Sequence, residues 1–354
     1  MSVLLLTASV TSASATEFYN GKTITFLINY PPGGSSDVEG RLIVRHLRSQ
    51  IPGKPNIIVQ NMGGAGGIIG ANWLGEIAKP DGLTLGYLTG MPARAALGDP
   101  ALRVDATKFA FVASAPGMEI MFIRSDTPPG IKKPADIMKA ENFWVGGFTP
   151  DSMKDLLSRM QLDLLGIKYR YLTAYTGSAE GRLALQRNEI QFYSEGMSTY
   201  RTSIEPNLVK TGEVTPLWYD PLDDGVTMRE QPDAEGIDAL PFDQFLKQQK
   251  GSIPQGQHWD AYRLINQLST KFLRVFVMPP NTPNELVAAI RVGLANLSKD
   301  AKFQEEAMKT ISLVPQFDTQ DDTEKLFHSS INPDRNLRRF IREYIAEGVK
   351  LGRR

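Results

Sequence analysis

The residues best suited to chemistry form two glycine-rich turns, each lying between an apolar run and a helical pattern. The first turn spans residues 30–37 and reads Tyr-Pro-Pro-Gly-Gly-Ser-Ser-Asp, after an apolar run at 24–28 and before an amphipathic pattern at 38–47. A helix N-terminus presents unpaired N–H groups and a partial positive charge, so it favours an anion. Ser35, Ser36 and Asp37 are also residue types that cap helices. The pattern predicts a turn that binds the carboxylate of a small ligand, although such turns also serve strand-to-helix geometry alone.

A second turn repeats this arrangement. Residues 61–67 read Asn-Met-Gly-Gly-Ala-Gly-Gly, between a strand-like run at 57–60 and a helical pattern at 68–78. Ligands of open α/β sheets bind in the crevice at the carboxyl ends of the strands. The two turns together therefore predict one shared anion site at that edge of a sheet.

The elements that must position these turns alternate between strand and helix. A third strand is predicted at 83–88, ending at Thr89, and another strand-like run at 119–124 is a candidate crossover into a second domain. The same order restarts with a strand at 143–147, a helix at 153–165, a strand at 169–172 and a helix at 179–188. Alternation of this kind predicts βαβ units and mainly parallel sheets, here in two α/β lobes.

Composition narrows the class of protein. The chain has 354 residues, 42% of them hydrophobic, with 39 Lys and Arg against 39 Asp and Glu, and this zero net charge argues against nucleic-acid binding. It has no Cys, so neither disulfides nor thiolate chemistry are expected, and no run of apolar residues is long enough to span a membrane. The apolar segment 3–10 precedes Ala13-Ser14-Ala15, which predicts a signal peptide over residues 1–15 and a periplasmic location, although no Lys or Arg precedes the segment.

Catalytic and cofactor motifs are missing from the sequence. Neither turn is followed by the Lys-Ser or Lys-Thr of a nucleotide P-loop, and in the second turn the third glycine of a dinucleotide fingerprint is replaced by Ile69. The three His residues are scattered, and no Ser lies in a nucleophile elbow. We therefore expect no cofactor, no metal and no enzymatic activity, but a protein that binds its ligand reversibly through neutral donors.

These motifs resemble those of a known family. The segments 31–37, 61–71 and 80–85, supported by 174–178 and 278–283, are similar to those of the periplasmic substrate-binding proteins of tripartite tricarboxylate transporters, the Bug-type receptors. The resemblance implies a type II periplasmic-binding-protein fold, with a ligand cleft and a hinge between two α/β lobes. Lobe 1 would comprise residues 16–118 and 275–354, and lobe 2 would comprise residues 119–274.

The resemblance also implies the residues of the pocket. Lobe 1 would contribute Pro32, Gly33, Gly34, Ser35, Ser36, Asp37, Gly64, Ala65, Gly66, Gly67 and Thr89, and lobe 2 would contribute Gly147, Thr149, Ser152, Tyr175, Thr176, Gly177 and Ser178. The chain departs from the family by lacking a His after Gly147 and by replacing a common Asp near residues 193–195. Lys154 and Arg170 are either partners of the ligand's carboxylate or solvated surface charges, and Tyr175 is either a ligand contact or a core aromatic.

The expected function follows from the resemblance. The protein would be a monomeric extracytoplasmic receptor that captures a small carboxylate, either a di- or tricarboxylate or an aromatic acid, by hinge closure. It would deliver this ligand to a membrane transporter with one large and one small subunit. A ligand-sensing ectodomain in signalling, and an enzyme on the same fold, are the alternatives.

Overall fold

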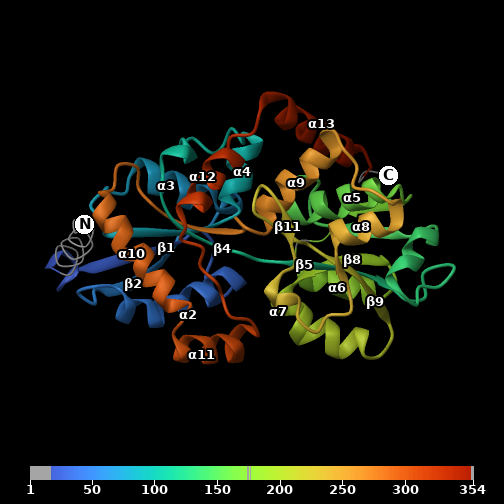
Figure 1. Ribbon diagram of the computed structural model, residues 1–354, viewed down its shortest axis with the longest axis horizontal. Coiled ribbons are helices and arrows are strands. Elements are labelled where there is room, and N and C mark those ends of the chain that lie inside the picture. Colours follow the sequence, from blue (N-terminus) through green and yellow to red (C-terminus); the bar gives the residue numbers. More distant parts are fainter. Residues whose placement is uncertain (1–16, 174, 176, 352–354) are drawn as a thin grey trace, which may run out of the picture. The chain divides into compact units, whose positions relative to one another are not determined.

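The computed structural model describes residues 17–173, 175 and 177–351, in two compact units (Figure 1). Unit 1 comprises the chain up to Pro116 together with Phe272–Asn332, and unit 2 comprises Gly117–Lys271 and the chain from Pro333 onward. The predicted signal peptide at 1–15 lies outside the described residues. Of the helices that the structure describes, none has the length and apolar character needed to cross a bilayer.

Unit 1 is built on a five-stranded sheet in the order β2-β1-β3-β13-β4. Its strands are β1 (Thr23–Ile28), β2 (Asn56–Asn61), β3 (Thr84–Thr89), β4 (Ala110–Ala115) and β13 (Arg274–Met278). The central strand β1 pairs in parallel with both β2 and β3, while β13 runs antiparallel to β3 and β4. The carboxyl ends of β1, β2 and β3 therefore meet at one edge, and β1 lies at the point where the chain order reverses.

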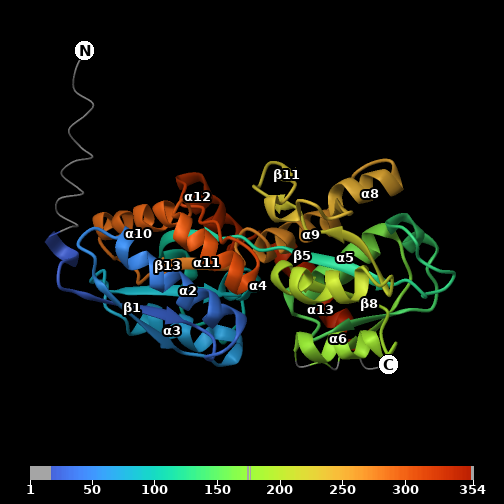
Figure 2. The same ribbon diagram turned by 90° about the horizontal axis from the view of Figure 1, so that it is seen from below.

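Helices cover both faces of this sheet (Figures 1 and 2). One face carries α2 (Ser35–Gln50), α10 (Asn284–Leu297) and α11 (Ala301–Ile311), and the other carries α3 (Ile68–Glu76), α4 (Met91–Leu97) and α12 (Asp321–Ser330). The short 3-10 helices η1 (Ala65–Gly67) and η2 (Ala106–Lys108) lie in the connections. Phe26, Tyr87 and Phe276 are fully buried and their rings pack against one another, so the three central strands share one aromatic core.

Unit 2 is built on a six-stranded sheet in the order β12-β9-β5-β8-β6-β7. Its strands are β5 (Glu119–Arg124), β6 (Trp144–Gly147), β7 (Arg170–Thr173), β8 (Phe192–Gly196), β9 (Val214–Tyr219) and β12 (Leu240–Pro241), with a small separate hairpin of β10 (Leu222–Asp223) and β11 (Met228–Arg229). Strand β6 is parallel to both β7 and β8, and β5 is antiparallel to β8 and β9. The carboxyl ends of β6, β7 and β8 thus lie along one edge of the sheet, as those of β1, β2 and β3 do in unit 1. We call each of these edges, with the turns that follow its strands, the turn edge of its unit.

The helices of unit 2 also lie on both faces of its sheet (Figure 1). One face carries α5 (Met153–Leu165), α8 (Phe242–Lys250), α9 (Gln257–Ser269) and α13 (Arg335–Leu351), and the other carries α6 (Ser178–Gln186), α7 (Met197–Thr199) and the π-helix η4 (Tyr200–Val209). The 3-10 helices η3 (Pro134–Lys139) and η5 (Pro232–Ala234) complete the unit.

The last helix corrects the predicted division of the chain, which gave all of 275–354 to lobe 1. Helix α13 belongs to unit 2, because α5 holds it through a buried guanidinium. Arg159, 1% exposed, donates to the carbonyl of Tyr344 at 3.2 Å and stacks on its ring at 4.3 Å. The hydroxyl of Tyr344 donates to Asp163 at 2.5 Å. At Gly348 a Cβ atom would lie 2.0 Å from Arg159 Nη1, so only glycine admits this close approach.

Candidate ligand-binding site

The first glycine turn of unit 1 is shaped by Asp37. This carboxylate, 4% exposed, accepts hydrogen bonds from the Gly33 amide at 2.9 Å, from Arg41 Nε at 3.0 Å and from Asn61 Nδ2 at 2.9 Å. Burial alone would raise the pKa of Asp37, but these donors hold it below its ordinary value. Helix α2 itself begins after Gly34, with no side chain capping it. The prediction that Ser35, Ser36 or Asp37 caps α2 is thus wrong, because Asp37 folds back to Gly33 instead.

Two backbone donors remain open at the start of α2. The amide of Asp37 donates to the Gly34 carbonyl at 3.0 Å, whereas no protein acceptor is found among the described residues for the amides of Ser35 and Ser36. Ser35 is exposed, while Ser36 is buried and shares a hydrogen bond of 3.1 Å between its hydroxyl and that of Thr89. The turn therefore keeps the unpaired donors at a helix N-terminus that an anion requires.

The second glycine turn has the same property. Gly64, Ala65, Gly66 and Gly67 all have positive φ, at 122°, 49°, 63° and 92°, so the turn follows a backbone path that glycine favours. The Gly67 amide closes the turn by donating to the Gly64 carbonyl at 3.0 Å. Within the described part of the chain, the amides of Ala65 and Gly66 have no protein acceptor. The turn therefore offers two further open donors.

A buried asparagine joins the second turn to the end of β3. Asn29 follows β1 directly and is 0% exposed. Its Nδ2 atom donates to the carbonyls of Gly67 at 3.2 Å and Thr89 at 3.0 Å, and its Oδ1 atom accepts from the Thr89 amide at 2.9 Å. A Cβ atom at Gly67 would lie 2.2 Å from Asn29 Nδ2, so this contact depends on glycine. The prediction that the two turns share one edge is confirmed within unit 1.

Two further side chains lie beside the second turn. The Tyr30 hydroxyl donates to the Gly66 carbonyl at 3.4 Å. Burial raises the pKa of Tyr30, and the neighbouring Arg94 partly offsets this. Arg94 also pairs with Asp99 at 3.3 Å, and a Cβ atom at Gly66 would lie 3.1 Å from Arg94 Nη2. A guanidinium beside open amides adds attraction for an anion.

Neither Asn29 nor Arg94 was predicted as a site residue, and Tyr30 was predicted only as part of the first turn. For Asn29 the sequence held a signal, because it is the polar residue that ends an apolar strand immediately before the turn. For Arg94 the sequence held no such signal, because this residue lies in the helix that follows the third strand.

The corresponding turn of unit 2 is filled by a side chain of the protein. Asp155, 2% exposed, accepts from the Phe148 amide at 3.1 Å, from the Ser152 hydroxyl at 2.7 Å and from the Tyr171 hydroxyl. Burial raises the pKa of Asp155, although these three donors oppose the rise. Ser152 also caps α5 by accepting from the Asp155 amide. Gly147 is buried, and its missing side chain leaves room for the Asp155 carboxylate, since a Cβ atom there would lie 2.0 Å from Oδ2.

Lys154 lies inside unit 2 at the ends of β6 and β8. Its ammonium donates to the Ser194 carbonyl and lies 4.0 Å from the centre of the Tyr193 ring. Burial alone would lower the pKa of Lys154, but Glu119 and Glu195 outweigh burial and raise it. Of the two alternatives for Lys154, a solvated surface charge is therefore wrong.

The other predicted residues of unit 2 lie around its turn edge. Thr149 is exposed, and Tyr175, Gly177 and Ser178 are half-buried just before and at the start of α6. Burial raises the pKa of the Tyr175 hydroxyl, with a smaller contribution from Glu189. Thr176 lies outside the described residues. Ligand contact by these residues, and by Gly147 and Ser152, stays a prediction.

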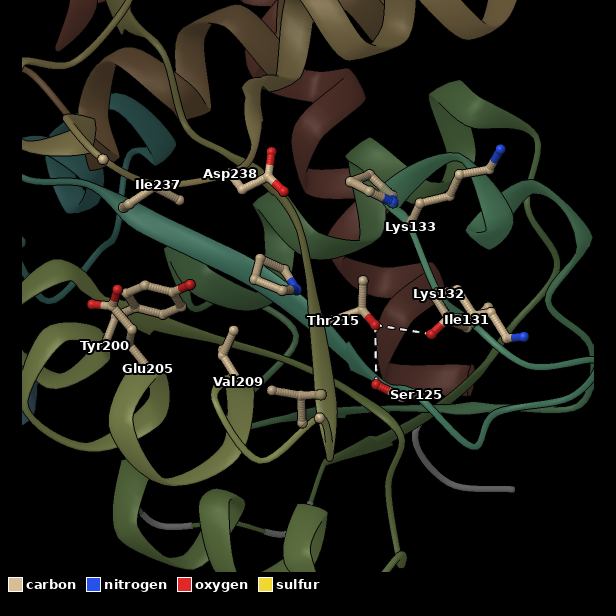
Figure 3. A pocket seen from close by; sticks show the side chains of 15 residues that line it. Ser125, Ile131, Lys132, Lys133, Tyr200, Glu205, Val209, Thr215, Ile237 and Asp238 are labelled. Atoms are coloured by element: carbon tan, nitrogen blue, oxygen red, sulfur yellow. Dashed lines mark hydrogen bonds between the residues drawn. The ribbon is translucent and has the colours of Figure 1, made fainter.

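A cavity of about 530 Å³ lies at the opposite edge of the sheet of unit 2 (Figure 3). Ser125, which follows β5, and Thr215, near the start of β9, join hydroxyls at 3.0 Å in its wall, and Thr215 also donates to the Ile131 carbonyl at 2.9 Å. No predicted site residue lines it. In the part of the chain that the structure describes, no group of three or more acidic, His or Cys side chains could hold a metal.

The geometry of both units defines the class of fold, and comparison with solved structures agrees. The chain matches a TctC solute-binding protein from Polaromonas with a TM-score of 0.65 and 19% identity, over 93% of this chain and 99% of that one. It matches the periplasmic binding protein BugD with a TM-score of 0.55 and 18% identity, over 94% and 99%. MatC from Rhodopseudomonas palustris, with bound malate, matches with a TM-score of 0.52 and 17% identity, over 94% and 99%. The chain thus has the predicted type II periplasmic-binding-protein fold.

Sequence comparison identifies the relatives. No family model matches the chain. Protein BugT of Bordetella pertussis is 36% identical over 83 residues, which make up 23% of this chain and 24% of BugT. A UPF0065 protein from the TAR-I ttuE-ttuC' intergenic region of Agrobacterium vitis is 28% identical over 221 residues, 60% of this chain and 62% of that protein. The chain therefore spans less than two thirds of the length of these relatives. The chain is thus similar to Bug-type proteins in sequence and in fold, and the resemblance seen in its turn motifs is confirmed.

Proposed function

We propose that the protein is an extracytoplasmic solute-binding receptor that captures a small carboxylate and delivers it to a membrane transporter with one large and one small subunit. The observation that carries this proposal is the edge of unit 1 where the amides of Ser35, Ser36, Ala65 and Gly66 have no acceptor among the residues that the structure describes. Asn29 holds the second turn and the end of β3 together at this edge, and the Arg94 guanidinium lies beside it. Hydrogen bonds to a charged group contribute about 1.5–3 kcal/mol each, so a few of them give useful affinity.

The ligand's carboxylate would bind at this edge, with Pro32, Gly33, Gly34, Asp37, Gly64, Gly67 and Thr89 shaping it. The turn edge of unit 2 would contact the rest of the ligand in a hinge closure. A ligand stabilises a closed state only by its higher affinity for that state. The receptor would act as a monomer in the periplasm, without a cofactor and without catalysis. The likeness to solved solute-binding proteins supports the receptor reading.

The test is isothermal titration of protein that has been unfolded, dialysed and refolded to remove any ligand. The panel contains mono-, di- and tricarboxylates and aromatic acids. We expect at least one acid to bind with micromolar affinity or tighter. The Ser36→Ala variant should bind it too, because backbone amides rather than the Ser36 hydroxyl donate to the carboxylate. Refolded protein that binds none of these acids would contradict the proposal.

A further inference from the structure

Strand β2 leaves one side of the sheet of unit 1 unpaired. It is the end strand of that sheet and pairs only with β1. The Asn56 amide donates to the Lys22 carbonyl at 2.8 Å, towards β1. Because the direction of the backbone groups alternates along a strand, the N–H and C=O groups of Ile57, Val59 and Asn61 point away from β1. Within the described part of the chain, none of these three amides has an acceptor.

The other end strands of the two described sheets are covered or short. Beyond β4, Asp318 pairs with Ser114 through backbone hydrogen bonds of 3.0 and 2.9 Å. Strand β12 has two residues, and β7 has four and lies beside α13. Proteins protect an open edge with charged residues or proline, but β2 reads Asn-Ile-Ile-Val-Gln-Asn and has neither. An unprotected edge of six residues can accept a further strand.

The side chains of β2 indicate which residues a further strand would carry. Ile57 and Val59 pack against the core that β2 shares with α2. Ile58 therefore lies on the opposite face of the sheet, which α3 covers, and it is 48% exposed. An added strand would place alternate side chains beside Ile58, so β-branched and apolar residues fit there.

The amino end of this open edge is basic. Lys22, Arg48 and Lys54 are exposed there, and Arg48 Nε lies 3.5 Å from the Lys54 carbonyl. Arg41 and Arg45 of the same helix are paired with carboxylates at 3.0 and 2.5 Å. Among the described residues, no carboxylate forms an ion pair with the first three cations. They are therefore available to acidic side chains of a partner.

Four carboxylates also lie towards this end of unit 1. Glu76 forms an ion pair of 2.7 Å with Arg103. Asp81 accepts from an amide of its own turn before β3, and Asp300 accepts from the last residue of α2 and from α11. Glu17 is exposed and precedes β1. One exposed carboxylate does not offset three cations, so the charge beside β2 stays positive.

We propose that β2 binds an extended segment of a partner protein as a sixth strand of the sheet of unit 1. The segment carries Asp or Glu at the end that lies against Lys22, Arg48 and Lys54, and β-branched residues along its length. Its carbonyls accept from the outward amides of β2, and its amides donate to the outward carbonyls. This surface goes beyond the proposed function, because it binds a protein segment at β2 rather than a solute at the glycine turns.

Labelled peptides test the preference for an acidic strand. A rhodamine-labelled Glu-Glu-Val-Thr-Val-Thr-Val peptide and its reversed sequence are used, because a strand can add in either direction. Each has a counterpart with Lys in place of both Glu. In fluorescence anisotropy we expect one acidic peptide to bind at least about tenfold more tightly than its Lys counterpart. If neither acidic peptide binds, or if the Lys counterparts bind equally well, the proposal is overturned.

A proline variant tests the backbone pairing. The Val59 N–H points away from β1, so Val59→Pro removes an outward donor without removing a bond between β1 and β2. We expect the affinity for the acidic peptide to fall at least about tenfold, whereas Val59→Ala, which keeps the donor, stays close to wild type. Thermal unfolding shows whether each variant is folded. Unchanged peptide binding by folded Val59→Pro would contradict strand addition.

A charge variant and the oligomeric state complete the test. Arg48→Gln should weaken binding of the acidic peptide about threefold, and the control Lys247→Gln, an equal change at an exposed residue of α8 in unit 2, should not. Equal effects of the two variants would overturn the role of the basic end. Sedimentation velocity detects pairing of two copies of the chain. A dimer that is lost in Val59→Pro would make a second copy the occupant and overturn the proposed partner.

Discussion

Replacing Asn29 tests most directly whether its hydrogen bonds fix the second glycine turn in the position that carboxylate binding requires. Replacing Asn29 with Ala removes three hydrogen bonds, two to the carbonyls of Gly67 and Thr89 and one from the Thr89 amide. At about 1 kcal/mol for each bond, and with the side chain 0% exposed, we expect a loss of about 3 kcal/mol in unfolding free energy. The second turn also loses its connection to β3, so carboxylate affinity should fall by at least about tenfold, or ~1.4 kcal/mol.

The matched control is Asn72→Ala in the same unit. Asn72 is 3% exposed and makes two backbone hydrogen bonds of 2.9 Å, to the Ala101 carbonyl and from the Arg103 amide. We expect this variant to lose about 2 kcal/mol of stability while it keeps wild-type affinity. Denaturant unfolding measures the first quantity and isothermal titration the second.

Two outcomes would refute the reasoning. If folded Asn29→Ala binds the carboxylate as tightly as the wild type, the edge does not depend on this asparagine. If Asn72→Ala loses as much affinity as Asn29→Ala, the loss reports general destabilisation rather than the geometry of the turns.

Further changes test other parts of the structure. Gly67→Ala should lower the free energy of unfolding by more than about 2 kcal/mol, because φ is 92° and the new methyl group would meet the buried side-chain amide of Asn29. The control Gly21→Ala, with φ at 69° and open space around it, should lower it by about 1 kcal/mol. Equal losses in thermal unfolding would contradict the steric argument. The pKa of Asp37 is lowered in the folded state, so its stabilisation is present above the unfolded pKa of about 4 and is lost as pH falls through the folded value. The stability gap between wild type and Asp37→Asn should therefore shrink in acid, and a gap that does not change with pH would exclude this role. Tyr344→Ala should destabilise unit 2 by about 3 kcal/mol, because it exposes the buried Arg159. Hydrogen exchange in α5 should then accelerate. Exchange that rises only in α13 would show that this helix is not an integral part of the unit.

The local order of the chain could be predicted from the sequence because it depends on neighbouring residues. The apolar run at 24–28, the glycine turn and the amphipathic pattern after it became β1, the first turn and α2. Positive φ at Gly33, Gly64, Gly66 and Gly67 follows from residue type, whereas the positive φ of Ala65 does not. These features placed the candidate carboxylate edge.

The contacts that decide the chemistry could not be predicted, because they join distant residues. Asn29 forms hydrogen bonds with Gly67 and Thr89, which lie 38 and 60 positions further along the chain, and Arg159 bonds to Tyr344, 185 positions away. No local pattern encodes which unit the last helix joins. Asp155 had the sequence signature of an ordinary acidic residue in the first helical turn, and only its tertiary contacts show that it fills the turn before it.

The placement of α13 gives the two ends of the described chain to different units, with Glu17 in unit 1 and Leu351 in unit 2. A donor fluorophore attached near one end and an acceptor near the other would therefore be attached to different units. Energy transfer between them would report a change in the distance between the two units. Because the chain has no native cysteine, one introduced thiol at each end would be the only attachment point there.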